Sequence, residues 1–276
     1  MIVFSGLIFG QRLDDLRSLA LAGGAFAVFC ALSSAMYLVN DLIDRVEDRH
    51  HPLKSQRPIA AGTLPPMTAG LGAAALGIMG LAVAFWLRPM FGVFSLGFVA
   101  LLGAYSYLLK HIVIVDVLTI STGFVLRAVA GAVAIAVPIS QWLLVCTVLL
   151  ALFLGLSKRR QELTLLGPVA TDHRRILAEY SPQLLDQLIA IVSAATLVSY
   201  AFYTMEPSTV EKFGTSGLTL TLPFPIYGIF RYLYLVYTRQ GVEGPSETLL
   251  RDLPLLTCVT LWAAAIVVII YGPFHP

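Results

Sequence analysis

Residues 19–50 read LALAGGAFAVFCALSSAMYLVNDLIDRVEDRH, and this stretch joins a long apolar run to a cluster of acids. The apolar run, Leu19–Val39, has the length of about 20 residues that a bilayer-spanning helix requires. Asp41, Asp44 and Asp48 follow it at spacings of three and four residues, which places their carboxylates on one face of a helix. The stretch therefore predicts a membrane helix whose end presents three aligned carboxylates.

The composition of the chain excludes a soluble domain. Of its 276 residues, 58% are hydrophobic and 12% are charged, whereas soluble domains contain about 25% charged residues. Cys30, Cys146 and Cys258 occur singly within apolar runs, and we interpret them as reduced thiols that pack like small hydrophobic side chains. The chain is therefore expected to be an integral membrane protein.

Apolar runs recur along the whole chain. Seven more have the length of a membrane span: Met67–Leu87, Met90–Leu109, Ile112–Ile135, Gln141–Ser157, Leu184–Thr204, Gly217–Tyr237 and Pro254–Gly272. Met1–Gly10 is apolar but too short to cross a bilayer, and we interpret it as the second half of a helix that starts upstream. The predicted fold is an all-α integral membrane bundle of nine transmembrane helices, the first one truncated, in a single polytopic domain over residues 1–276.

Lys and Arg are distributed unequally between the two sets of loops. The loops 41–66, 110–111, 158–183 and 238–253 contain twelve of them: Arg45, Arg49, Lys54, Arg57, Lys110, Lys158, Arg159, Arg160, Arg174, Arg175, Arg239 and Arg251. The opposite loops contain only Arg12, Arg17, Arg88 and Lys212. Because positive residues favour the cytoplasmic side, the sequence predicts a multi-pass cell-membrane protein whose acidic cluster faces the cytoplasm.

The three acids after the first full span predict a metal site. Carboxylates on one helix face repel one another unless a cation lies between them. Mg2+ is the expected cation because it prefers oxygen ligands and keeps waters and substrate phosphates in its shell, and Mn2+ is a second candidate. The alternative is a solvated helix end, but acids near a helix C-terminus oppose the helix dipole. Asp41, Asp44 and Asp48 are therefore the predicted metal ligands and catalytic residues.

A basic loop follows the acids. Residues 51–62 read HPLKSQRPIAAG, and their two prolines and one glycine predict a rigid, non-helical loop. Lys54 and Arg57 are suited to bind phosphate oxygens, Lys as a point charge and Arg as a fork. The same residues would also satisfy the excess of positive charge beside the membrane, so this alternative stays open.

Ionisable residues also occur within the apolar runs. Asp116, Arg127 and Arg231 lie at membrane depth, where charged groups are expensive and usually mark a site. Asp116 and Arg127 share a helix face because they are eleven residues apart, which is about three turns. Pairing with other helices is the alternative for both, and Arg231 is close enough to a helix end to extend its charge to the interface.

The acidic stretch resembles a motif of known enzymes. Asn40–Asp48 fits N-D-x-x-D-x-x-x-D, which is similar to the first Asp-rich motif of the UbiA prenyltransferase superfamily. Other segments resemble its decaprenyl-phosphate phosphoribosyltransferase branch: His51 to Gly62, Tyr105-Ser106 with Lys110-His111 and Asp116, Gly123-Phe124 to Gly131, and Ser157-Lys158-Arg159 to Glu162-Leu163. Together they cover nearly the whole chain, although the basic and aromatic segment that the family carries before its first helix is absent.

The resemblance implies a bundle of nine transmembrane helices around a central cavity that opens to the cytoplasm. It implies that the phosphate of a polyprenyl (decaprenyl) phosphate attacks C1 of 5-phosphoribosyl diphosphate and releases diphosphate in a Mg2+-dependent reaction. The implied substrate-binding residues are Asn40, Lys54, Arg57, Tyr105, Lys110, Arg127, Lys158, Arg159 and Glu162, and Asp116 is a fourth catalytic residue. The partners are the donor, the lipid phosphate and the bilayer, without nucleic acid, and a homo-oligomer is compatible with the sequence.

Two alternatives and one assignment stay open. Arg127, Lys158 and Arg159 are equal candidates for binding the 5-phosphate of the donor. An aromatic prenyltransferase would use the same acids on a prenyl diphosphate, but Asp116 stands alone where such enzymes have a second Asp-rich motif. A transporter would use the intramembrane charges as an ion path, but the acids cluster at one membrane face and no inverted repeat is visible.

Overall fold

Helices make up all the regular structure in the computed structural model, which describes residues 2–50, 54–166, 179–238 and 244–272. A chain in lipid must satisfy its backbone N–H and C=O groups internally, and a helix does so within one segment. The predicted all-α membrane fold is confirmed. His51 and Pro52 of the basic loop, and the predicted loop residues Arg174, Arg175 and Arg239, lie outside the described residues.

Seven of the described helices are long and apolar enough to cross a membrane. They are α2 (Leu16–His50), α3 (Pro66–Leu87), α4 (Pro89–Tyr107), α5 (Val115–Ala134), α6 (Gln141–Leu166), α8 (Pro182–Met205) and α12 (Leu253–Tyr271). Each corresponds to a predicted span, so the protein is a multi-pass membrane protein.

The predicted span Gly217–Tyr237 is divided in the structure. A 3-10 helix, η6 (Gly217–Thr221), precedes α10 (Pro223–Thr238), which has 16 residues. Proline fixes φ at a helical value and lacks the N–H that a first helical turn leaves unpaired, so Pro223 favours the start of a new helix. The N-terminal apolar run forms two short helices, η1 (Ile2–Phe4) and α1 (Ser5–Phe9). The count of nine transmembrane helices stays a prediction.

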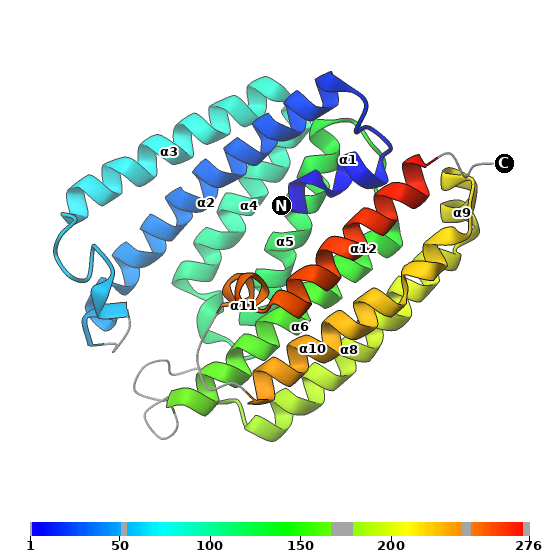
Figure 1. Ribbon diagram of the computed structural model, residues 1–276. Coiled ribbons are helices and arrows are strands. Elements are labelled where there is room, and N and C mark those ends of the chain that lie inside the picture. The colour runs from blue at the N-terminus through cyan, green and yellow to red at the C-terminus, as the bar shows by residue number, and fades with distance from the viewer. Residues whose placement is uncertain (1, 51–53, 167–178, 239–243, 273–276) are drawn as a thin grey trace. The chain divides into compact units, whose positions relative to one another are not determined.

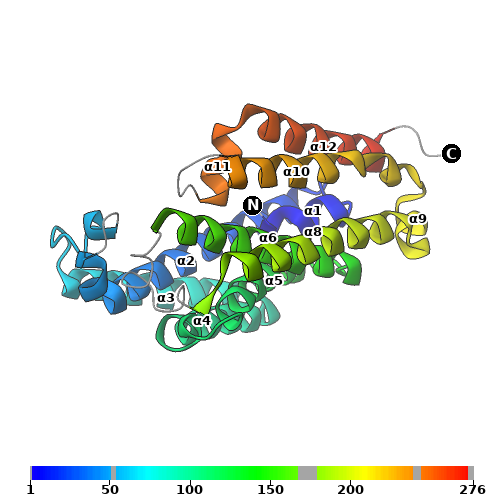
Figure 2. The same ribbon diagram turned by 90° about the horizontal axis from the view of Figure 1, so that it is seen from below.

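The described helices belong to two compact units, one up to Ile139 and one from Ser140 onward. The first contains η1 and α1 to α5, with η2 (Lys54–Gln56) after α2 and η3 (Leu109–His111) after α4. The second contains α6 and α8 to α12, including α9 (Pro207–Phe213) and α11 (Pro245–Arg251), and in it α10 lies beside α12 (Figure 2). The single domain over residues 1–276 stays a prediction.

The helix that carries the acids is longer than its apolar run. α2 has 35 residues and begins where the carboxylate of Asp15 accepts hydrogen bonds from the Ser18 hydroxyl at 2.7 Å and the Arg17 N–H at 3.0 Å. These hydrogen bonds lower the pKa of Asp15, and the one from the Ser18 hydroxyl has the larger effect. The helix continues past Val39 and ends at His50. All three acids therefore lie on regular helix, as the spacing argument requires.

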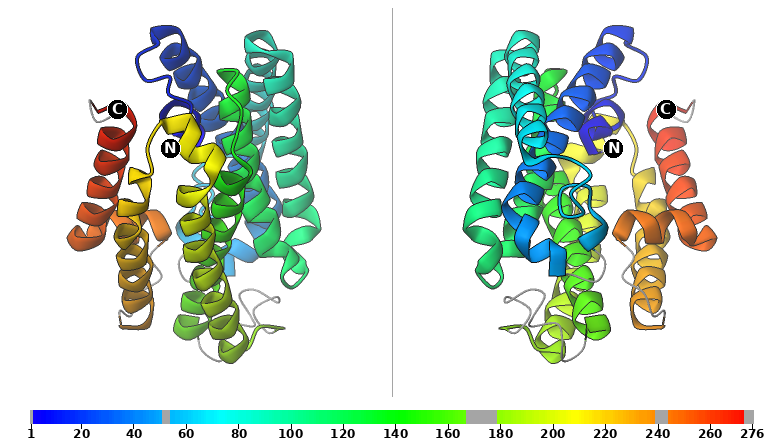
Figure 3. Two further views of the ribbon diagram at one scale, coloured as in Figure 1. Left: turned by 90° about the vertical axis from the view of Figure 1, so that its right-hand side faces the viewer. Right: turned by 90° about the vertical axis from the view of Figure 1, so that its left-hand side faces the viewer.

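Aromatic side chains hold the helices of the first unit together. α2 lies beside α3 and α4, and α4 beside α5 (Figure 1 and Figure 3). Phe29 of α2 packs edge-on against Phe91 and Phe98 of α4, with ring centroids 5.8 and 5.2 Å apart. On α5, a Cβ at Gly131 would lie 2.3 Å from the carbonyl oxygen of Val3, so the close approach of η1 requires glycine there.

Candidate active site

The carboxylates of Asp41 and Asp48 share one basic partner. Arg57, just after η2, donates from Nη1 to Oδ1 of Asp41 at 2.7 Å and to Oδ2 of Asp48 at 2.9 Å. Lys54 Nζ lies 3.9 Å from the other oxygen of Asp48. The side chain of Asp48 is only 4% exposed, so its charge has lost most of its hydration and depends on these partners.

Asp44 has a different basic partner, from a distant part of the chain. Lys110 in η3 is buried and its Nζ binds Oδ1 of Asp44, while the amide of Asn40 donates to Oδ2 at 3.1 Å. Lys110 and Asp44 are 66 residues apart in the sequence, and they meet because α4 packs beside α2. The end of α2 thus gathers six predicted site residues: Asn40, Asp41, Asp44, Asp48, Arg57 and Lys110, with Lys54 beside them.

The described part of the basic loop is held against the end of α2. Its backbone carbonyl at Ala60 accepts a hydrogen bond from Nε of Arg49 at 3.3 Å, and Ile59 and Ala60 are buried. Gly62 has a φ of 80°, a left-handed value that glycine adopts without steric cost. The loop was predicted to be non-helical, but it contains the short 3-10 helix η2.

The donor chemistry of the acidic face suits Mg2+. Carboxylate oxygens are its preferred protein ligands, and Asp41 and Asp48 already lie on either side of one cationic nitrogen. In this structure the repulsion between the acids is relieved by the chain's own basic residues. Within the described ranges no three His, Cys, Asp or Glu side chains gather closely enough to hold a metal, and Asp44 is directed to Lys110. The metal-binding role of the three acids stays a prediction.

The turn between Lys110 and Asp116 has an unusual backbone. Ile114 has a φ of 68°, which a β-branched residue rarely adopts and which costs about 1–3 kcal/mol. Asp116 is fully buried in the first turn of α5, where a carboxylate interacts favourably with the helix dipole. Tyr105, in α4, is partly buried. Backbone strain of the kind seen at Ile114 persists only where the surrounding packing holds it, and it clusters at functional sites.

Arg127 lies on α5. It contacts α2 at Ser33, which is further from the acidic end of α2 than the three acids are. Its Nη2 donates to the hydroxyl of Ser33 at 3.3 Å, and its guanidinium lies over the rings of Phe98 and Phe124, at 4.8 and 5.2 Å from their centroids. Nε is buried and has no hydrogen-bond partner within the described chain. A guanidinium held by rings and a hydroxyl keeps donors available for an anion.

Sequence reasoning did not single out Ser33, although its spacing contained the signal. Ser33 precedes Asp44 by eleven residues, which is about three turns, so both lie on one face of α2. The two residues are roughly 16 Å apart along the helix axis. One face of α2 therefore makes polar contacts both at its acidic end and, at Ser33, with Arg127 of α5.

The remaining predicted site residues lie on α6, in the second unit. The predicted span ended at Ser157, but α6 continues to Leu166, so Lys158, Arg159 and Glu162 are helical. Arg159 is 3% exposed and donates from Nη1 to Glu162 at 2.7 Å. Two neighbouring polar atoms, Ser157 Oγ and Gln161 Oε1, are buried without a hydrogen-bond partner in the described part of the chain.

Arg231 has a structural partner in the second unit. Its Nε and Nη2 donate to the two carboxylate oxygens of Asp252 at 3.0 and 2.8 Å. Asp252 also caps α12 by accepting the N–H of Leu255 at 3.0 Å. The ion pair joins α10 to the start of α12. The alternative predicted for Arg231 was an extension of its charge to the membrane interface, whereas the structure shows an ion pair with Asp252.

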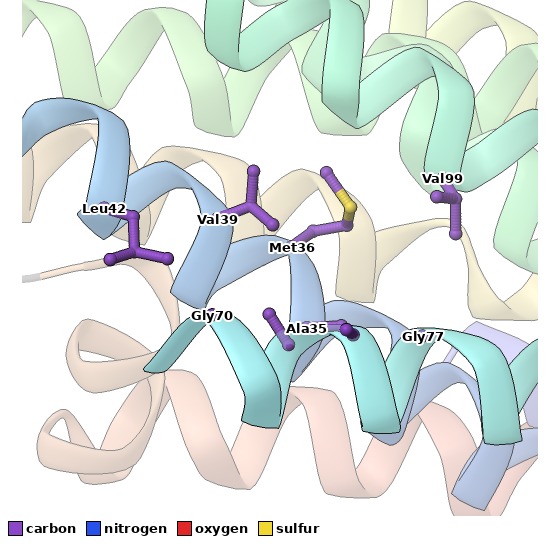
Figure 4. Close-up of a pocket in the computed structure, with 9 residues that line it drawn as sticks. Ala35, Met36, Val39, Leu42, Gly70, Gly77 and Val99 are labelled. Atoms are coloured by element: carbon purple, nitrogen blue, oxygen red, sulfur yellow. The ribbon is translucent and has the colours of Figure 1, made fainter. Parts of the chain in front are cut away.

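An apolar groove of about 300 Å³ lies beside α2 (Figure 4). It is lined by Ala35, Met36, Val39 and Leu42 of α2, by Gly70, Ala73, Ala74 and Gly77 of α3, and by Val99 of α4. At 3.6 residues per turn, these α2 residues lie almost half a turn from the three acids. The groove is therefore on the opposite face of α2 and is not part of the polar site.

Comparison with known proteins identifies the class. The model of the UbiA prenyltransferase family matches residues 1–246. The chain therefore belongs to the UbiA prenyltransferase family and is a membrane-embedded enzyme. The recognition of this family from the Asn40–Asp48 motif is confirmed.

Several curated relatives are named decaprenyl-phosphate phosphoribosyltransferase. The chain is 33% identical to the decaprenyl-phosphate phosphoribosyltransferase of Mycobacterium tuberculosis over 258 residues, covering 93% of this chain and 84% of that protein. It is 35% identical to the protein of the same name from Corynebacterium glutamicum over 254 residues, covering 90% and 75%. A UbiA homolog from Archaeoglobus fulgidus, solved bound to GPP and Mg2+, has the same fold with a TM-score of 0.72, at 19% identity and over 98% of this chain and 94% of that one.

Proposed function

We propose that the protein transfers 5-phosphoribosyl from 5-phosphoribosyl diphosphate to a polyprenyl phosphate, such as decaprenyl phosphate, and releases diphosphate. The observation that carries this proposal is the similarity, over most of the chain, to proteins named decaprenyl-phosphate phosphoribosyltransferase. The end of α2 supports it, because three carboxylates and three basic side chains meet there.

The polar site is suited to a diphosphate and a divalent cation. Asp41, Asp44 and Asp48 would hold Mg2+, which would neutralise the negative charge on the departing diphosphate. Mn2+ is a second candidate for the same ligands. Arg57 and Lys110 pair with these carboxylates in the structure. With the carboxylates bound to a metal ion, Arg57 and Lys110 would have N–H donors for the diphosphate oxygens.

The reaction forms one bond and breaks one bond at the anomeric carbon of the donor. A phosphate oxygen of the acceptor bonds to C1, the bond from C1 to the diphosphate oxygen breaks, and its electron pair leaves with the diphosphate. The acceptor phosphate is already anionic at neutral pH, so no side chain has to remove a proton. The residues of the site have to bind two anions, align them and exclude water.

Arg127 supplies a cation away from the acidic cluster. A donor with a diphosphate at one end and a 5-phosphate at the other requires two separate anion sites. The buried guanidinium of Arg127, with its unpaired Nε, is a candidate for the second of these sites. Lys158 and Arg159 of the second unit are the other candidates.

The distribution of Lys and Arg supports an orientation for the site. We propose that the end of α2 with the acids faces the cytoplasm of the cell membrane, since the loops on that side hold most of the basic residues. A water-soluble sugar diphosphate would then reach the acids from the cytoplasm, and the lipid phosphate from the bilayer.

A second candidate function is prenyl transfer to an aromatic acceptor. The UbiA homolog from Archaeoglobus fulgidus was solved bound to GPP and Mg2+ and also bound to DMAPP and Mg2+, which favours this candidate. The purified protein should be incubated with radiolabelled 5-phosphoribosyl diphosphate, polyprenyl phosphate and Mg2+. A labelled lipid is expected. Turnover of an aromatic acceptor without any labelled lipid would replace the proposal with this candidate.

Substitution of the acids tests the metal site. Asp41→Asn and Asp44→Asn should each lower the transfer rate by about a hundredfold or more, because charge stabilisation of the leaving group is lost. Asp15→Asn, at the other end of α2, is the matched control and should keep the wild-type rate. Near-normal rates in both site variants would exclude the metal role of this cluster.

A further inference from the structure

Arg57 occupies the place between two carboxylates where a metal ion is expected. One nitrogen, Nη1, lies 2.7 Å from Asp41 and 2.9 Å from Asp48. This nitrogen carries two N–H bonds, so it can donate one to each carboxylate. A divalent cation that is coordinated by both Asp41 and Asp48 would need the same oxygens and the same space.

We propose that Arg57 is an exchangeable counter-ion, which holds Asp41 and Asp48 in the donor-free protein and moves to the diphosphate when metal and donor bind. The proposal rests on the metal and diphosphate site of the proposed function, but not on the identity of the transferred group. Arg57 thereby makes strong metal binding conditional on the donor.

The burial of Asp48 explains why the two cations exchange rather than bind independently. Its side chain is 4% exposed, and a buried carboxylate without a cation is strongly unfavourable. Lys54 Nζ is 3.9 Å from Asp48 whereas the guanidinium is 2.9 Å away, so the guanidinium is the close partner and stays until another cation replaces it. A released guanidinium also needs an anion, and the diphosphate supplies oxygens in the paired geometry that arginine binds. Metal and donor thus stabilise each other's binding, and the coupling is reciprocal.

The position of Arg57 permits the exchange. Its side chain is 36% exposed and extends from the turn after η2, so it can move without opening the helix packing. Lys110 differs, because its side chain is 9% exposed and it pairs with Asp44 from η3. Arg57 is therefore the mobile cation of the cluster, and Lys110 is a fixed one.

Metal affinity without donor or acceptor is the direct test. Mn2+ binding to the purified protein is followed by electron paramagnetic resonance, with no other substrate present. Arg57→Gln should bind Mn2+ about tenfold more tightly than the wild type, within the usual range of coupling between sites. Arg45→Gln removes the same charge from an exposed position on α2, so it controls for the loss of one positive charge near the acids. Equal Mn2+ affinity in Arg57→Gln and Arg45→Gln would overturn the proposal.

Arginine labelling of the wild-type protein tests the same exchange without a substitution. Phenylglyoxal labelling is read at Arg57 by mass spectrometry. Mn2+ alone should increase the labelling, because the metal displaces the guanidinium from the carboxylates. Addition of 5-phosphoribosyl diphosphate should then decrease it, because the diphosphate covers the side chain. Labelling that responds to neither addition would refute the exchange.

The two measurements separate this inference from the proposed function. Neither measurement contains an acceptor lipid or requires turnover. If the exchange is observed but no labelled lipid forms in the transfer assay, the counter-ion role stands and the proposed reaction fails. If the labelled lipid forms but Mn2+ affinity is unaffected by Arg57→Gln beyond the Arg45→Gln control, the reaction stands and the counter-ion role fails.

Discussion

The ion pair between Lys110 and Asp44 offers the sharpest test of how the site is built. The side chains of Lys110 and Asp44 are 9% and 17% exposed. Removal of one member of a buried ion pair costs about 3–5 kcal/mol. Asp44 keeps some solvent and the hydrogen bond from Asn40, so Lys110→Met should lower the free energy of unfolding by about 3 kcal/mol, the low end of that range.

A double-mutant cycle isolates the pair from other effects of the substitution. Asp44→Asn leaves the ammonium of Lys110, the more buried member, without its carboxylate and should cost about 3 kcal/mol or more. The double variant contains neither charge, so its loss should be smaller than the sum of the two single losses by at least about 1 kcal/mol. Arg45→Met, at an exposed position on α2, should change the stability by less than about 0.5 kcal/mol.

The cycle is measured on purified protein in detergent micelles, with SDS-induced unfolding followed by circular dichroism. The four proteins of the cycle are compared at the same pH and salt concentration, without metal or donor. Losses that add up to within about 0.5 kcal/mol would show that the two side chains do not interact, and the assembly of the site across α2 and η3 would be refuted.

Four further substitutions separate binding from packing. Arg127→Ala should raise the apparent KM for the phosphoribosyl donor by about tenfold or more, because a charged hydrogen bond of about 1.5–3 kcal/mol is lost; an effect on the lipid acceptor alone would reassign the residue. Gly131→Ala should destabilise the protein by about 1–3 kcal/mol in SDS unfolding, because its Cβ would overlap backbone atoms of η1. Gly103→Ala, where no heavy atom lies within 4 Å of the new Cβ, should have little effect. Arg231→Met should lower the stability but leave both KM values unchanged, and a changed KM would give it a role in binding.

The acidic face of α2 could be predicted from the sequence because the information is local. The spacing of Asp41, Asp44 and Asp48 defines one face of any helix that contains them, and α2 does continue through all three. One basic partner of these acids is not local. Lys110 is 66 residues from Asp44, and no periodicity in either segment indicates that they meet.

The ends of the spans were less predictable than the spans themselves. Hydropathy marks the part of a helix that lies in lipid, but a helix extends beyond it when its polar end is stabilised by other contacts. α6 runs nine residues past Ser157 to Leu166, and Arg159 pairs with Glu162 on that extension. A helix can also be shorter than its apolar run: the run from Gly217 to Tyr237 is divided before Pro223 into η6 and α10.

The role of Arg231 also depended on tertiary structure. At sequence level it is an ionisable group within an apolar run, as Arg127 is. In the structure Arg231 is paired with both oxygens of Asp252, while Nε of Arg127 is buried without a hydrogen-bond partner in the described chain. The same sequence signal thus corresponds to a structural ion pair in one case and to a candidate anion site in the other.

By itself the sequence determined the membrane helices, the alignment of three carboxylates and the family. Lipid requires each spanning segment to satisfy its own backbone, so length and hydropathy suffice to locate it. Only the tertiary structure decided which cation neutralises which carboxylate. The packing of α4 beside α2 brings Lys110 to Asp44, and the fold of the loop after α2 leaves Arg57 between Asp41 and Asp48.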